Sequence, residues 1–144
     1  MHYSTLSTLL FVAFTSGAAI SSIPKDSKAK RDVGCYNVHN NPDWMKYDVF
    51  NSGINTVCDS LEGLEIGPGS NLLITVPGLK LEDGRDGEFV GSLENTGSDS
   101  YRVDYNYCSG RMGAIRDQCS GSSDQTYGGE WHDVIWVRAD TNAV

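Results

Sequence analysis

The four cysteines of this chain, and the places they occupy, constrain its fold more than any other feature. Cys35 precedes a helical pattern that contains Cys58, and Cys108 and Cys119 lie in the last third of the chain. An even number of cysteines in a short exported chain is typical of a disulfide framework formed in an oxidising compartment. We therefore predict two disulfides within one small domain.

An apolar leader precedes the cysteines. Residues 6–19 have the length and the small closing residues of a signal peptide, and they are too short for a spanning helix, which needs about 20 apolar residues. We assign residues 1–19 to a signal peptide and predict an extracellular protein without stable membrane insertion. Residues 20–31 end in Lys30-Arg31 and are interpreted as a pro-segment cut by a kexin-type protease, a step typical of fungal secretion. The alternative is an exposed basic tail that is never cut.

The predicted mature domain, residues 32–144, is strongly acidic. Residues 1–31 contain four of the 11 basic residues and one of the 19 acidic residues, which leaves 113 residues with 7 basic and 18 acidic groups, a net charge of −11. Such a surface repels phosphate backbones, so we predict no nucleic-acid partner. A neutral or cationic partner fits better.

An amphipathic helix is predicted from Pro42 to the region of Gly63. Asn41-Pro42-Asp43 supplies a cap, a first-turn proline and a first-turn acid, and Gly63 is a suitable stop. Apolar residues recur at intervals of three and four and define one buried stripe. The positions of this stripe are Trp44, Tyr47, Phe50, Ile54, Val57, Cys58 and Leu61.

The middle of the chain changes to a period of two. Residues 72–76, 88–93 and 101–107 are predicted strands, separated by segments rich in glycine, aspartate, asparagine and serine. A final strand is predicted from Trp131 to Arg138. Together with two helices, these strands predict a single α+β domain with an antiparallel sheet of about four to five strands.

A second, shorter helix is predicted around Cys108, Met112, Ile115 and Cys119, which share one face. If the segment is helical throughout, Cys108 and Cys119 are about 16 Å apart along the axis. A disulfide needs α-carbons within about 7 Å, so these two cysteines should not pair with each other. Two connectivities remain, and each ties this helix to both the N-terminal segment and the first helix.

The segment from Tyr127 to Arg138 is the candidate binding surface. Aromatic faces cover the C–H side of a sugar ring, and carboxylates and guanidinium groups bind its hydroxyls. On a single strand, Trp131 and Asp133 would share one face, and His132, Trp136 and Arg138 the other; at least one tryptophan is expected in the core. The candidate ligand-binding residues are Tyr127, Glu130, Trp131, His132, Asp133, Trp136 and Arg138.

An enzymatic alternative uses the same segment. A small acidic secreted domain with two disulfides, one helix and a meander also describes the guanyl-specific fungal ribonucleases, which need a general base, a general acid and an arginine on one sheet face. Glu130, His132 and Arg138 are the candidates, but three groups on one strand cannot surround a phosphate. We therefore predict a protein that is not an enzyme, with no catalytic residue, no metal site and no cofactor.

The order of elements resembles that of small secreted fungal proteins related to the ink-cap mushroom glycan-binding lectin. The resemblance is carried by Gly34-Cys35-Tyr36, the helix ending at Cys58-Asp-Ser-Leu-Glu-Gly63, the helix with Cys108 and Cys119, Gly128-Gly129, and the closing Arg138-Ala-Asp-Thr-Asn142. Thr141 stands where the family has proline, and the family's last cysteine is absent. The resemblance implies an α+β fold and possible glycan binding, and it supplies no binding residue.

Three functional hypotheses follow. The leading one is a non-catalytic secreted protein that binds a carbohydrate or a host or cell-wall component. The second is an effector or killer-toxin-like protein that acts on a protein or membrane target. The third is the small acidic ribonuclease.

Overall fold

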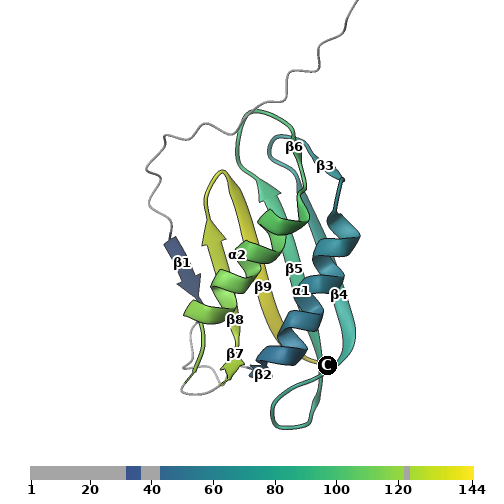
Figure 1. The fold of residues 1–144 in the computed structure, drawn as a ribbon, viewed down its shortest axis with the longest axis vertical. Helices are drawn as coiled ribbons and strands as arrows, with labels where there is room; N and C mark the ends of the chain where they lie inside the picture. Colours follow the sequence, from purple (N-terminus) through teal and green to yellow (C-terminus); the bar gives the residue numbers. More distant parts are fainter. Residues whose placement is uncertain (1–31, 37–42, 122–123) are drawn as a thin grey trace, which may run out of the picture.

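One five-stranded antiparallel sheet carries two helices on the same face (Figure 1). The computed structural model describes residues 32–36, 43–121 and 124–144. The elements are β1 (Asp32–Cys35), β2 (Met45–Lys46), α1 (Tyr47–Leu61), β3 (Glu65–Ile66), β4 (Asn71–Lys80), β5 (Asp86–Asn95), β6 (Tyr101–Arg102), α2 (Tyr105–Gln118), β7 (Gln125–Thr126), β8 (Gly128–His132) and β9 (Ile135–Ala143).

The strands of the main sheet stand in the order β1-β8-β9-β5-β4. Helix α1 packs over β4 and β5, and α2 packs over β8 and β9. Two pairs of short strands, β2 with β7 and β3 with β6, complete the described part of the fold. This architecture confirms the predicted fold class, and the strands predicted at 72–76 and 88–93 lie within β4 and β5.

Helix α1 confirms the predicted apolar stripe but begins later than predicted. Phe50 and Leu61 are buried, and Gly63 ends the segment with a φ of 76°. The predicted start near Asp43 is wrong, because Met45 and Lys46 pair with β7 as a short strand and the helix begins only at Tyr47. Asn41 and Pro42, part of the predicted cap, lie outside the described residues.

The strand predicted at 101–107 is wrong beyond Arg102. Asp104 is the N-cap of α2, where its side chain accepts a hydrogen bond of 2.8 Å from the backbone N–H of Tyr107. A capping carboxylate satisfies one of the unpaired donors at a helix start. This local hydrogen bond outweighs the alternating pattern of Tyr101 to Tyr107, so the second half of that pattern belongs to the helix.

The strand predicted from Trp131 to Arg138 is also wrong, because a turn at Asp133 and Val134 divides it into β8 and β9. The Asp133 side chain accepts a hydrogen bond of 2.8 Å from the Val134 N–H, a local bond that favours a turn over a strand. The turn adds two residues, an even number, so Trp131 still faces the same side as Val137, its partner in the ladder. Odd-numbered and even-numbered residues of β8 and β9 therefore lie on opposite faces of the sheet as predicted, although the strand is not continuous.

One disulfide joins α2 to β1, and the other joins the two helices to each other. Cys35 of β1 bonds Cys119 at the C-cap of α2, and Cys58 of α1 bonds Cys108 of α2. The Cα–Cα distances are 5.3 and 5.8 Å. The prediction that Cys108 and Cys119 do not pair with each other is confirmed, and one of the two open connectivities is selected.

The core lies between the helices and the sheet. Within the core, the aromatic rings of Phe50 and Phe89 pack edge-to-face, with their centroids 4.8 Å apart. The largest fully buried apolar side chains are Phe50, Phe89, Met45, Leu61, Ile66, Leu93, Met112, Ile115, Val57 and Val137.

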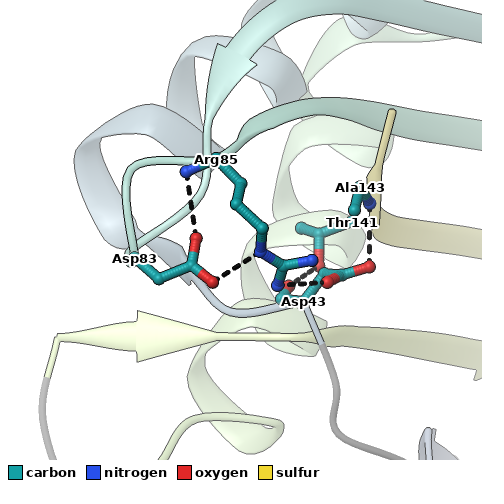
Figure 2. A network of polar contacts seen from close by, with 5 residues as sticks. All are labelled: Asp43, Asp83, Arg85, Thr141 and Ala143. Carbon is teal, nitrogen blue, oxygen red and sulfur yellow. Dashed lines mark hydrogen bonds and ion pairs between the residues drawn. The ribbon is translucent and has the colours of Figure 1, made fainter.

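A polar network closes the end of the sheet near the C-terminus (Figure 2). The guanidinium of Arg85 donates to Asp83 at 2.6 Å and to Asp43 at 2.8 Å. Asp43 also accepts from the Ala143 N–H at 2.8 Å, and its carbonyl accepts from the Thr141 hydroxyl. The network joins the segment before β2 to the β4–β5 turn and to the last strand, so Asp43, predicted as an acid in the first turn of the helix, binds Arg85 and the last strand instead.

Candidate functional site

The face of the sheet opposite the helices, here called the open face, carries the candidate site. On β8 and β9 the even-numbered residues point to it, while odd-numbered residues such as Trp131 and Val137 are buried beneath the helices. Glu130 on β8 lies directly across from Arg138 on β9. Six side chains gather there, which we call the open-face cluster: Tyr36, Glu130, His132, Trp136, Arg138 and Asp140.

The carboxylate of Glu130 lies at the centre of this cluster. The Tyr36 hydroxyl donates to its Oε1 at 3.0 Å, and His132 Nε2 lies 3.0 Å from its Oε2. Each carboxylate oxygen therefore has one hydrogen-bond partner among the residues that the structure describes. Since an ionised carboxylate offers about four acceptor positions, Glu130 keeps capacity for a ligand.

An aromatic platform adjoins this carboxylate. The rings of His132 and Trp136 are 4.5 Å apart and tilted by 30°, and Trp136 is 43% exposed. An exposed tryptophan held in place by a neighbouring ring presents a flat apolar surface without loss of side-chain freedom on binding. Such a surface fits the C–H face of a sugar or another flat ligand.

Arg138 supplies the positive charge of the cluster. Its Nη2 donates to Asp140 Oδ2 at 2.5 Å, and its Cζ lies 5.4 Å from the centre of the Tyr36 ring. Asp140 is only 8% exposed and also accepts from the Thr141 N–H at 2.9 Å. The buried aspartate orients the guanidinium, which has five N–H donors and thus remains able to bind a ligand.

The surroundings shift the pKa values of the cluster. Burial opposes the ionised form of Glu130, but the hydrogen bonds from His132 and Tyr36 outweigh it and lower the pKa of this carboxyl. Burial raises the pKa of Asp140 despite the hydrogen bond from Arg138, and burial also raises the pKa of Tyr36. At neutral pH the cluster therefore holds an ionised Glu130 beside a protonated Tyr36 and a charged Arg138.

Four of the seven predicted binding residues come together in the open-face cluster, namely Glu130, His132, Trp136 and Arg138, and the other three lie elsewhere. Trp131 is 6% exposed beneath α2, with the guanidinium of Arg111 4.4 Å from its ring centre. Tyr127 packs edge-to-face on Trp44 at 4.7 Å. Asp133 forms the turn between β8 and β9.

Two members of the open-face cluster, Tyr36 and Asp140, are not among the binding residues predicted from the sequence. Asp140 could have been found, because it continues the even-numbered series after Trp136 and Arg138 along one strand. Tyr36 had no local signal, because it reaches the cluster through the pairing of β1 with β8, nearly a hundred residues away. The predicted processing pair Lys30-Arg31 lies outside the described residues.

No protein-family model matches this chain, and no curated protein matches it. What the structure defines is a small α+β domain with a five-stranded antiparallel sheet, two helices and two disulfides. The bonded cysteines are consistent with an oxidising compartment. The resemblance to the ink-cap lectin family stays a prediction.

Two further properties concern the described part of the chain alone. Neither of its helices combines the length and the apolar character that crossing a membrane requires. In residues 32–36, 43–121 and 124–144, no group of three or more His, Cys, Asp or Glu side chains could hold a metal ion.

Proposed function

We propose that this protein is a secreted, non-catalytic binding protein whose open-face cluster recognises carbohydrate of a host surface or a cell wall. The observation that carries the proposal is the exposed Trp136, stacked on His132 and bordered by the charged groups of Glu130 and Arg138. Sugar sites combine these features because a pyranose has one apolar face and a rim of hydroxyls.

The electrostatics of the cluster support a neutral or cationic ligand. The predicted mature chain carries a net charge of −11, and the one arginine of the cluster is already paired with Asp140. A sugar hydroxyl can donate to Glu130 and accept from Arg138 without bringing a negative charge into this acidic surface. The cluster thus favours hydroxyl-rich ligands over anions.

The test is a glycan array probed with the protein after both disulfides have formed. We expect binding to at least one glycan class, and a loss of at least tenfold in affinity for Trp136→Ala. Glu130→Gln should also weaken binding, and Glu88→Gln is its matched control, because Glu88 lies on the same face beside Asn142, outside the cluster. Absence of glycan binding, or full binding by Trp136→Ala, would contradict the proposal.

A second candidate function is ribonuclease activity, and one observation favours it. Glu130, His132 and Arg138 do not lie on one strand; they lie on two paired strands, with Glu130 across from Arg138 and His132 3.0 Å from Glu130. The objection that three groups on one strand cannot surround a phosphate therefore does not apply to this arrangement. Glu130 could accept the proton of a ribose 2′-hydroxyl, His132 could protonate the leaving oxygen, and Arg138 could bind the phosphate.

Digestion of a defined RNA decides between the two candidates. Cleavage that is lost in Glu130→Gln and in His132→Ala, but kept in Glu88→Gln, would establish the ribonuclease. Absence of cleavage by the native protein would eliminate it and leave the binding proposal as it stands.

A further inference from the structure

Strand β1 brings one member of the open-face cluster into place. β1 is an edge strand of four residues that pairs only with β8 in the main sheet. Tyr36 follows directly after it, and its hydroxyl contacts Glu130 while its ring lies beside the Arg138 guanidinium. The position of Tyr36 therefore depends on how firmly β1 is held.

β1 is held by a short ladder, by one disulfide and by the packing of Val33 against the core. The ladder has four residue pairs, from Asp32 with His132 to Cys35 with Gly129. A strand of this length with one neighbour is only marginally stable by itself. The Cys35–Cys119 bond fixes the residue immediately before Tyr36 to the end of α2. We infer that the disulfide, more than the ladder, keeps Tyr36 in the cluster.

The two disulfides differ in their access to solvent. Cys35 is exposed, whereas Cys58 and Cys108 are both 0% exposed within the core. A thiolate must reach a sulfur atom to attack it, so exposure decides which disulfide reacts first. At the edge strand a thiolate can approach only along the exposed residue Cys35, because Cys119 is 1% exposed; in the bond between the helices neither residue is exposed.

We propose that Cys35–Cys119 is a redox-sensitive fastener of the open-face cluster. Its reduction releases β1, withdraws Tyr36 from Glu130 and Arg138 and weakens ligand binding, while Cys58–Cys108 keeps the two helices joined on the sheet. The loss of ligand binding rests on the proposed carbohydrate function; the release of Tyr36 does not.

The reductant is a low-molecular-weight thiol of the glutathione class. One thiolate attacks the Cys35 sulfur, the Cys35–Cys119 bond breaks, and Cys119 leaves as a thiolate that takes up a proton. A second thiolate attacks the resulting mixed disulfide and releases Cys35, which is also protonated. Two thiols are oxidised to one disulfide, and the two protein sulfurs gain two electrons and two protons.

The first experiment measures reduction itself. The full protein is exposed to reduced glutathione, quenched by alkylation at successive times, and analysed by mass spectrometry. We expect Cys35 and Cys119 to be alkylated at least about tenfold faster than Cys58 and Cys108, because attack requires access. Equal rates for the two pairs would overturn the proposal.

The second experiment needs no ligand and follows the carboxyl of Glu130 by NMR titration. Losing the Tyr36 hydrogen bond should raise the pKa of Glu130 in Tyr36→Phe, which keeps the ring and removes only the hydroxyl. The double variant Cys35→Ala with Cys119→Ala should raise it to the same extent. Adding Tyr36→Phe to the double variant should then have no further effect.

The remaining outcomes are decisive as well. An unchanged pKa of Glu130 in the double variant would show that β1 stays in place without the Cys35–Cys119 bond. Loss of the near-UV circular dichroism signal would show that Cys58–Cys108 cannot keep the domain folded. Either result overturns the proposal. If the oxidised native protein binds no glycan on the array, the proposed function fails, and the NMR titration still tests the release of Tyr36.

Discussion

Gly53 lies in the middle of α1, where replacement by alanine would normally stabilise a helix by about 1 kcal/mol. The structure predicts the opposite result here. A Cβ atom at position 53 would lie 2.5 Å from Cγ of Phe89 and 2.8 Å from its Cβ. Favourable contacts between carbon atoms need about 3.5–4.0 Å, so this approach is strongly repulsive. The glycine allows α1 to lie directly on β5.

The magnitude follows from two opposing terms. Inserting a methyl group into a filled core costs about 1–3 kcal/mol, and the upper part of that range, about 2–3 kcal/mol, applies here because Phe50 packs against the Phe89 ring with the centroids 4.8 Å apart. Subtracting the gain in helix propensity, we expect Gly53→Ala to lower the free energy of unfolding by about 1–2 kcal/mol. The midpoint of thermal unfolding should fall by about 4–8 °C for each kcal/mol lost in a domain of about this size.

Gly113 in α2 provides the matched control. Apart from the neighbouring residues and the backbone of the helix itself, no heavy atom lies within 4 Å of the Cβ that alanine would place there. Gly113→Ala should therefore stabilise the protein by about 0.5–1 kcal/mol. Both variants are compared by urea unfolding with the disulfides intact. If Gly53→Ala unfolds at the same urea concentration as the native protein or at a higher one, the packing argument for α1 on β5 is wrong.

Three further predictions concern single side chains. Trp131→Ala should destabilise the protein by about 3–5 kcal/mol because it empties a buried site, whereas Trp136→Ala should change stability by less than about 0.5 kcal/mol; urea unfolding measures both. Asn95 is 1% exposed and bonds two carbonyls and one N–H, so Asn95→Ala should cost about 2–3 kcal/mol in the same assay. The hydrogen bond from Arg85 lowers the pKa of Asp83 below 3.8, so its stabilising effect is present above that pH and is lost as the pH falls through the lowered pKa. The fall in melting temperature on acidification should be smaller in Asp83→Asn than in the native protein.

Local patterns in the sequence predicted both helices and the strands β4 and β5, but neither the ends of the helices nor the division of the last predicted strand into β8 and β9. The stripe from Phe50 to Leu61 repeats at helical spacing over several turns, and tertiary packing could only reinforce it. The start of α1 depended on a partner far along the chain, since Met45 pairs with Thr126 of β7. The start of α2 depended on Asp104, whose capping role was hidden by the alternating tyrosines around it. A strand pattern and a helix cap competed there, and the cap prevailed.

The candidate site was predictable only along a single strand. Trp136 and Arg138 share a face because side chains alternate along a strand, and the two-residue turn before β9 preserved that alternation from His132 onwards. Tyr36 required knowledge that β1 pairs with β8, and nothing near Tyr36 specifies that pairing. The choice between the two disulfide connectivities likewise depends on which distant segments lie side by side in the fold. Cys119 stands at the end of α2 that lies beside β1, which the cysteine spacing alone does not show.

The two faces of the sheet differ in what a substitution there would do. The odd-numbered residues of β9, such as Val137, are buried under the helices, so they serve the fold. Trp136 and Arg138 are exposed on the open face and contribute little to the core, which leaves them free for recognition. Asp140 joins both roles, since it is 8% exposed and its carboxylate orients Arg138. Asp140 is buried, ionisable and bonded to the one arginine of the cluster. A substitution of Asp140 that alters ligand binding would therefore also affect the stability of the fold most directly.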